Sequence, residues 1–232
     1  MFVQLDTDAF HATPRGGLSR TRFGVPNQGR LLSQTRAALA WPEWTEESRK
    51  MVFTTPEVEI LLARSTDLPR MLAAGIVDGC VTGRDYVIEA GVEDEVEEII
   101  DLGFQATNLC VLAAAESVTE ENDALEPVVV VSQYPAIASR WIGGGLGQGK
   151  RRRATLVPID GAAEMYVTSG LARYAVDAVM TGRTLRDNGL AVVETLFASA
   201  GCVYSRGREH LDRDKIETLA TLGRQLFAEG QR

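Results

Sequence analysis

The feature that most constrains this chain is a regular alternation of short apolar runs with segments of helical periodicity. The apolar runs, which predict strands, occur at 23–25, 58–63, 78–81, 128–132, 154–159, 175–180 and 200–205. Turn residues and apolar residues at helical spacing predict helices at about 31–39, 65–75, 84–88, 136–141, 162–169 and 212–230. Strands that alternate with helices predict an α/β protein with largely parallel sheets, and with ligand sites at the carboxyl ends of the strands.

Composition narrows the class of protein. The 232 residues suffice for one large or two small domains. Lys and Arg number 24 against 32 Asp and Glu, and the net charge of -8 argues against a general binder of nucleic acid or anionic membranes. Two histidines without ligand spacing argue against His-based catalysis and His-rich metal sites. No apolar run approaches the roughly 18 residues that span a bilayer.

The cysteines and the N-terminal residues indicate in which cellular compartment the protein is expected. Cys80, Cys110 and Cys202 form no C-x-x-C motif, so we expect buried thiols in a reducing environment. The first residues lack the basic and apolar regions of a signal peptide. We therefore expect a cytoplasmic protein.

Two glycine-rich or basic segments are expected to be loops. Residues 1–20 are polar and aperiodic, which predicts a loosely held extension. The segment 144–151 approximates a P-loop, but Arg151 stands where a Ser or Thr would hold Mg²⁺, and a helical run rather than a strand precedes it. We interpret residues 143–153 as a basic surface loop.

The best placed phosphate-binding signal follows the apolar strand 175–180. Next come Thr181, Gly182, Arg183, Thr184 and Leu185. Gly182 permits close approach of the backbone, while loop N–H groups and the two threonine hydroxyls can donate to a phosphate. Asp177 lies within the apolar strand, where a carboxylate is costly unless paired, so we expect it to accept ribose hydroxyls or approach Mg²⁺ through water. The alternative is a purely structural acid.

A second loop of the same kind occupies residues 78–85, where Thr82 and Gly83 separate a short strand from a helix. Two such loops in one chain suggest two anionic or nucleotide ligands, bound between lobes. The alternative is an ordinary strand–helix turn in which Thr82 caps the helix.

Seven segments then occur in the order found in the ATP phosphoribosyltransferases, the first enzymes of histidine biosynthesis. They are residues 25–31, 60–69, 78–85, 101–104, 132–135, 161–164 and 176–190. The chain resembles this family over about residues 22–225. The resemblance implies that N1 of the ATP adenine is joined to C1 of phosphoribosyl pyrophosphate, with release of pyrophosphate and a requirement for Mg²⁺.

The resemblance also implies the domain organisation. It predicts a two-lobed, periplasmic-binding-protein-like α/β fold after an N-terminal extension at 1–21. Lobe I, on the nucleotide side, comprises 22–107 and 206–232, and lobe II, on the phosphoribosyl pyrophosphate side, comprises 108–205, with crossovers near Thr107 and Ser205. The chain is similar to the short form of the family. This resemblance implies homo- or hetero-oligomers and a regulatory subunit resembling histidyl-tRNA synthetase.

Site residues follow from the same resemblance. The residues implied to bind phosphoribosyl pyrophosphate are Asp177, Thr181, Gly182, Arg183, Thr184 and Leu185. Asp177 and Glu164 are implied to be catalytic, facing the ribose and a pyrophosphate that itself carries the Mg²⁺, with no direct protein ligand to the metal. The residues implied to bind ATP are Arg30, Arg64, Thr82, Gly83 and Asp85. For each of these, a salt bridge or helix cap is the structural alternative.

Two positions depart from the family pattern. Gln28 stands where a Lys is usual, and Arg173 stands where an acid is common. These departures leave open a diverged phosphoribosyltransferase that modifies another nitrogen heterocycle. A non-catalytic, two-lobed ligand-binding or regulatory protein is a third reading, although such a protein has no need of Asp177 and the loop 181–185 together.

Overall fold

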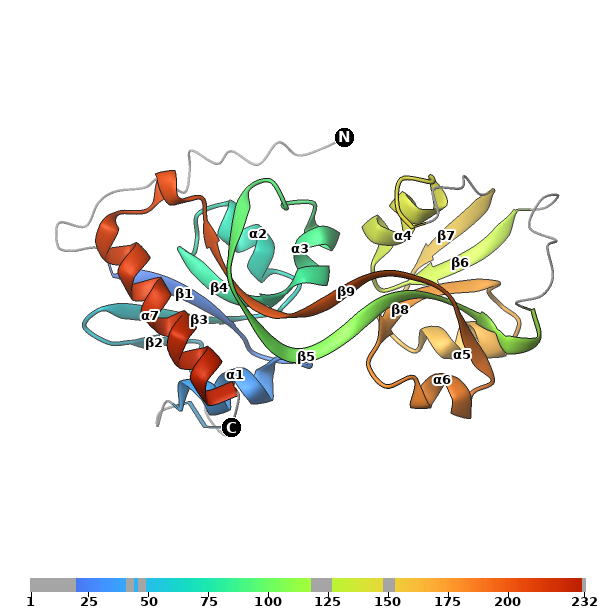
Figure 1. Ribbon diagram of the computed structural model, residues 1–232, viewed down its shortest axis with the longest axis horizontal. Coiled ribbons are helices and arrows are strands. Elements are labelled where there is room, and N and C mark those ends of the chain that lie inside the picture. The colour runs from blue at the N-terminus through green and yellow to red at the C-terminus, as the bar shows by residue number, and fades with distance from the viewer. Residues whose placement is uncertain (1–19, 41–43, 46–48, 118–126, 148–152, 231–232) are drawn as a thin grey trace. The chain divides into compact units, whose positions relative to one another are not determined.

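The structure is a computed structural model that describes residues 20–40, 44–45, 49–117, 127–147 and 153–230. The chain divides into two compact units, 1–105 with 200–232 and 106–199. Both divisions fall within long strands, β5 (Val96–Ala114) and β9 (Leu190–Arg206), so these two strands contribute to both units (Figure 1). The expected crossover points, Thr107 and Ser205, lie in the same two strands. No helix in the described parts of the chain has the length and apolarity needed to cross a membrane.

In the first unit the strand order is β2 (Val52–Thr54), β3 (Val58–Ala63), β1 (Thr21–Pro26), β4 (Gly79–Gly83) and β9. β1 runs parallel to β3 and β4, whereas β2 is antiparallel to β3 and β9 is antiparallel to β4. The carboxyl ends of β1, β3 and β4 therefore lie at one edge of the sheet.

Helices cover both faces of this sheet. The apolar side chains of α1 (Leu32–Leu39) and α7 (Arg213–Gly230) share one cluster with β1 and β3, which includes Leu39, Leu219 and Leu226. Those of α2 (Leu68–Ala73) and α3 (Arg84–Ala90) share another cluster with Cys80 and Cys202. A short 3₁₀ helix, η4 (Arg208–His210), precedes α7.

The second unit has the strand order β5, β8 (Tyr174–Val179), β6 (Val128–Ser132) and β7 (Ala154–Pro158). β6 is parallel to β7 and β8, and β5 is antiparallel to β8. α5 (Ala163–Thr168) and α6 (Arg183–Asp187) pack with Val131 and Ala175. α4 (Pro135–Ile142) covers the opposite face, where Trp141 meets Tyr174 edge to face at 5.5 Å. The 3₁₀ helix η2 (Ala115–Ser117) follows β5.

The expected α/β alternation is confirmed, and the predicted strands at 58–63 and 128–132 match β3 and β6. Parallel pairing holds for β1, β3 and β4 and again for β6, β7 and β8, while the antiparallel pairs involve β2, β5 and β9. The sequence analysis missed β2, β5 and the first half of β9. β5 carries Glu97, Glu98 and Asp101 among its apolar residues, so it lacks a continuous apolar run. The extension at 1–19 and the basic residues 148–152 lie outside the described residues.

Gly24 provides a test of the packing of the first unit. It lies in β1 between Leu61 of β3 and Cys80 of β4. A Cβ at this position would lie 2.5 Å from Leu68 Cδ2 and 3.2 Å from Cys80 Cβ. We expect Gly24→Ala to lower the free energy of unfolding by about 1–3 kcal/mol, because the core must shift to accept the methyl group.

Thermal and denaturant unfolding followed by circular dichroism measure this loss. Gly145→Ala is the matched control, since its Cβ would meet nothing closer than the Arg140 carbonyl oxygen at 3.6 Å. Equal stabilities of the two variants would contradict the packing described for β1.

Candidate functional site

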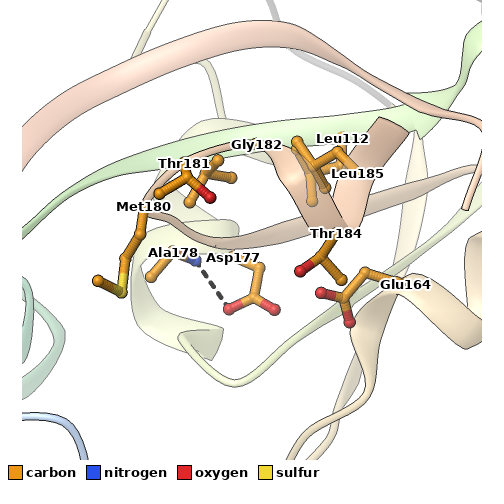
Figure 2. Close-up of a pocket in the computed structure, with 10 residues that line it drawn as sticks. Leu112, Glu164, Asp177, Ala178, Met180, Thr181, Gly182, Thr184 and Leu185 are labelled. Atoms are coloured by element: carbon orange, nitrogen blue, oxygen red, sulfur yellow. Dashed lines mark hydrogen bonds between the residues drawn. The ribbon is translucent and has the colours of Figure 1, made fainter. Parts of the chain in front are cut away.

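A cavity of about 280 Å³ opens at the carboxyl end of β8 in the second unit. Its walls combine β8, the loop that follows it, α6 and the start of α5, and Figure 2 shows the residues that line it. They are Leu112, Glu164, Asp177, Ala178, Val179, Met180, Thr181, Gly182, Thr184 and Leu185. A parallel strand that ends in a glycine turn and a helix thus builds the pocket, as the pattern at 175–185 predicts.

Asp177 is the buried acid of this pocket, with only 8% of its surface exposed. Its Oδ1 accepts the N–H of Ala178 at 2.7 Å and Nε2 of Gln133 at 3.2 Å. Burial raises the pKa of Asp177 to about 6, and the charge of Glu164 adds to the rise, while the two hydrogen bonds oppose it. The carboxylate is therefore ionised at neutral pH, yet it titrates near the physiological range.

Glu164 faces the same space from α5. Ala162 turns the chain in the left-handed conformation, at φ 55°, directly before this helix, which places Glu164 in its first turn. Figure 2 shows the carboxylates of Asp177 and Glu164 and the hydroxyl of Thr184 directed toward a common space. Glu164 and Thr184 also belong to the wall of a second cavity, of about 410 Å³, along α5 and α6.

The loop after β8 turns at Gly182, whose φ of 65° is a conformation that favours glycine. Thr181 Oγ1 accepts the N–H of Arg183 at 3.4 Å, and buried Leu185 anchors α6 to the core. The first turn of a helix leaves N–H groups without intrahelical partners, so this turn presents donors beside the pocket. The Arg183 guanidinium lies outside the pocket, largely exposed, and pairs with Asp187 at 3.7 Å.

The first unit holds a second constellation, at the carboxyl ends of β1, β3 and β4. Arg30 Nη2 donates to Oδ1 of the fully buried Asp85, and the Arg30 guanidinium lies 5.4 Å from the centre of the Tyr86 ring. A Cβ at Gly83 would collide with the Asp85 carboxylate and would lie 2.7 Å from Arg30 Nη2. Glycine at this position therefore allows the ion pair to form.

Several buried polar atoms of this constellation lack a hydrogen-bond partner among the residues that the structure describes. They are Asn27 Oδ1, Arg30 Nε, Arg30 Nη1 and Ser65 Oγ. Asn27 follows β1 and Ser65 follows β3, and the Ser65 carbonyl accepts the Thr82 hydroxyl at 3.1 Å. Buried donors and acceptors that remain unpaired indicate a site completed by a ligand or by water.

The structure thus groups most of the residues singled out from the sequence. In the second unit Asp177, Glu164, Thr181, Gly182, Thr184 and Leu185 surround one pocket. In the first unit Arg30, Thr82, Gly83 and Asp85 are neighbours, whereas Arg64 is exposed at the end of β3.

Three residues near these sites, Asn27, Ser65 and Gln133, were not among the site residues expected from the sequence. Each directly follows or lies within two residues of a predicted strand, and each belongs to a segment shared with the family. The signal that could have identified them is a polar residue just after the carboxyl end of a predicted parallel strand.

The two departures from the family pattern differ in position. Gln28 is exposed in the turn after β1, close in sequence to Asn27 and Arg30. Arg173 directly precedes β8, at the end of the strand opposite the pocket, and donates to the Ser117 carbonyl at 2.9 Å. The hypothesis that Arg173 alters the acceptor therefore finds no support in its position.

Comparisons with known proteins give the family. The family model for ATP phosphoribosyltransferase matches residues 64–224. An ATP phosphoribosyltransferase from Methanocaldococcus jannaschii is 29% identical over 220 residues, which cover 90% of this chain and 74% of that protein. One from Syntrophotalea carbinolica is 32% identical over 182 residues, covering 75% of this chain and 80% of the relative.

Among solved structures, the chain is similar to one in the ATP phosphoribosyl transferase (HisG:HisZ) complex from Thermotoga maritima. The TM-score is 0.69 at 16% identity, and the match covers 91% of this chain and 98% of the other, which shows a common fold. The family match and the curated relatives support the first of the three readings, an ATP phosphoribosyltransferase. The chain belongs to the ATP phosphoribosyltransferase family, the phosphoribosyl-transferring enzymes of the first step of histidine biosynthesis.

Proposed function

We propose that the Asp177 pocket binds phosphoribosyl pyrophosphate and that the Arg30–Asp85 constellation binds ATP. The observation that carries the first assignment is the convergence of two carboxylates on a cavity whose rim is a glycine turn with two threonines. A sugar with a phosphate at one end and a leaving group at C1 needs both kinds of group: phosphate donors and acceptors for ribose hydroxyls.

The loop at 181–185 suits the 5-phosphate. Thr181 and Thr184 supply hydroxyl donors, and the first turn of α6 supplies backbone N–H groups. Gly182 keeps the turn free of a side chain, so the phosphate can approach the backbone. The Arg183 guanidinium is largely exposed, pairs with Asp187 and does not line the pocket, so Arg183 would contribute through its N–H, which would turn to the phosphate from Thr181 Oγ1.

The carboxylates suit the reacting sugar. In the transfer, N1 of adenine forms a bond to C1 of the ribose as the bond from C1 to the pyrophosphate oxygen breaks, and positive charge develops on the sugar. Ionised Asp177 can accept ribose hydroxyls and, with Glu164, stabilise that charge from a fixed position. No side chain needs to act as a nucleophile in this step.

The residues of this pocket fit a Mg²⁺ ion that is bound mainly by the phosphates of the substrate. Oxygen donors are the ligands that Mg²⁺ prefers, and it commonly keeps several waters while bound to substrate phosphates. Glu164, Asp177, Thr181 and Thr184 offer such oxygens around the cavity. In this proposal the ion would arrive on the pyrophosphate, Glu164 and Asp177 would lie near it without ligating it directly, and it would supply charge neutralisation for the leaving group.

The constellation in the first unit suits a nucleotide. Arg30 Nε and Nη1 are buried and have no partner among the described residues, so each can donate a charge-assisted hydrogen bond to a phosphate oxygen. Asn27 Oδ1 and Ser65 Oγ remain available for the base or ribose. Exposed Arg64, at the end of β3, adds a second cation at the same edge of the sheet.

A partner chain belongs to the proposal as well. The related structure from Thermotoga maritima is described as a HisG:HisZ complex. We propose that this chain likewise assembles with a regulatory subunit, and that it forms oligomers. Size-exclusion chromatography with light scattering, alone and with a candidate subunit, tests the assembly.

The activity itself is tested by incubating the chain with ATP, phosphoribosyl pyrophosphate and Mg²⁺, with and without the candidate subunit. Release of pyrophosphate together with the absorbance of the ribosylated adenine is the expected result. Binding of phosphoribosyl pyrophosphate without an ATP-dependent product, even with the subunit present, would instead favour another acceptor base.

Two substitutions test the donor pocket. We expect Asp177→Asn and Thr184→Val each to weaken the binding of phosphoribosyl pyrophosphate by at least about 1–3 kcal/mol, because each removes a charged or phosphate-directed hydrogen bond. Isothermal titration calorimetry with Mg²⁺ measures the loss. Asp214→Asn and Thr221→Val on α7 are the matched controls. Affinities of the pocket variants equal to the controls would refute the assignment.

The pKa of Asp177 predicts a pH dependence. An ordinary aspartate loses its charge near pH 4, but burial holds this pKa at about 6, so its acceptor capacity falls as the pH drops through about 6. We expect the affinity for phosphoribosyl pyrophosphate to decline over that range. The phosphates of the ligand titrate in the same range. The ratio of wild-type to Asp177→Asn affinities between pH 5 and 8 isolates the carboxyl, and a constant ratio would be the contrary result.

Gly83→Ala tests the nucleotide side. Its φ of -86° is accessible to alanine, so the expected effect arises from collision with the Arg30–Asp85 pair and not from backbone strain. We expect the KM for ATP to rise at least about tenfold, the scale of one lost charged hydrogen bond, while affinity for phosphoribosyl pyrophosphate is unchanged. Steady-state kinetics with each substrate varied in turn measure both. Equal losses for the two substrates would contradict the separate sites.

A further inference from the structure

Gln133 is the polar residue outside the pocket wall that contacts its central acid. It lies between the end of β6 and the start of α4, and its Nε2 donates to Asp177 Oδ1 at 3.2 Å. None of the roles proposed above uses this residue. Its side chain therefore needs an explanation of its own.

The turn that carries Gln133 is fixed to β8 by Ser132. The buried Ser132 hydroxyl donates to the Val176 carbonyl at 2.6 Å and accepts the N–H of Tyr134 at 2.8 Å. Ser132 is also the strand partner of Val176 in the parallel pair β6–β8. Residues 132 and 134 are thus tied down on either side of Gln133, and the tie is to the residue that precedes Asp177.

The two hydrogen bonds of the Asp177 carboxylate fall on the same oxygen. Oδ1 accepts both the Ala178 N–H and the Gln133 amide, whereas within the described residues Oδ2 accepts none. A carboxylate held through one oxygen by two donors from different elements cannot rotate freely. The other oxygen keeps its lone pairs for a ligand in the cavity.

We infer that Gln133 is a positioning residue that fixes the rotation of the Asp177 carboxylate and presents Oδ2 to the sugar donor. The inference rests on the proposed function of the pocket and adds a residue to it. Gln133 acts through Asp177, so it requires no contact of its own with the ligand. The backbone donor, Ala178, belongs to the strand itself, which leaves Gln133 as the side chain that sets this geometry.

The surroundings of Asp177 define what else could move its titration. Glu164 on α5 is the charged group that acts on it, and it raises the pKa of Asp177. Cys110, its strand partner on β5, has a thiol that burial keeps protonated. The Gln133 and Ala178 donors lower the pKa of Asp177. Removal of the Gln133 donor should therefore move the titration of Asp177 upward.

Gln133→Met tests the inference, because methionine has a similar length, adds no charge and cannot donate. The exposed Gln225→Met on α7 is the matched control. We expect Gln133→Met to weaken the binding of phosphoribosyl pyrophosphate about fivefold at pH 7.5, the scale of one hydrogen bond, with the KM for ATP unchanged. The acidic limb of its binding profile should move to higher pH, which a purely structural role would not cause.

Two further measurements make the result decisive. In an Asp177→Ala background, Gln133→Met should cause no additional loss, because the carboxylate through which it acts is gone. In the ligand-free protein, carbon-13 NMR of the Asp177 carboxyl should show a higher midpoint of titration in Gln133→Met than in the wild type.

Contrary outcomes distinguish a failure of the proposed pocket function from a failure of the positioning role of Gln133. If the wild-type chain fails to bind phosphoribosyl pyrophosphate, the function of the pocket and this inference are both overturned. If Asp177→Ala weakens binding but Gln133→Met leaves the affinity and the Asp177 titration unchanged, only the inference is overturned. A full fivefold loss in the Asp177→Ala background would likewise overturn it.

Discussion

The fold depends on two long strands, β5 and β9, each of which contributes residues to both units. β9 pairs with β4 in the first unit, and β5 pairs with β8 in the second, although both strands also continue into the other unit. Residues 200–232, far along the chain, supply α7 and with it Leu219 and Leu226 to the first core. The first unit is therefore complete only when the chain after the second unit has been made, so its folding requires the C-terminal segment.

The feature of the second unit with the largest free-energy cost is a carboxylate buried in an apolar strand. Asp177 loses hydration, and two hydrogen bonds to one oxygen offset only part of the cost, as its raised pKa shows. A structural acid would be expected to have both oxygens paired. Leaving one oxygen toward a cavity shared with Glu164 has a physical rationale when a polyhydroxylated, phosphorylated ligand supplies the missing partners.

The same logic explains how a chain of net charge -8 accommodates two highly phosphorylated substrates. In the pocket proposed for the sugar phosphate, the available donors are hydroxyls and backbone N–H groups of a glycine turn, since the Arg183 guanidinium is largely exposed and does not line the pocket. In the first unit a partly buried Arg30 is held by Asp85, yet two of its nitrogens have no partner within the part of the chain that the structure describes. Under the proposed function, local geometry together with the charge of Mg²⁺ would overcome the overall negative field.

The sequence by itself determined the α/β class, the positions of β3 and β6 and the loop 181–185, because apolar runs and glycine turns are local signals. It also indicated Asp177, since an acid within an apolar strand is conspicuous in one dimension. It did not reveal β5, whose charged residues obscure the strand, nor the 3.2 Å contact between Gln133 and Asp177, which lie 44 positions apart in the sequence. Only the tertiary structure decided those, and it also placed Arg173 away from the pocket, because pairing between distant strands sets which strand ends meet.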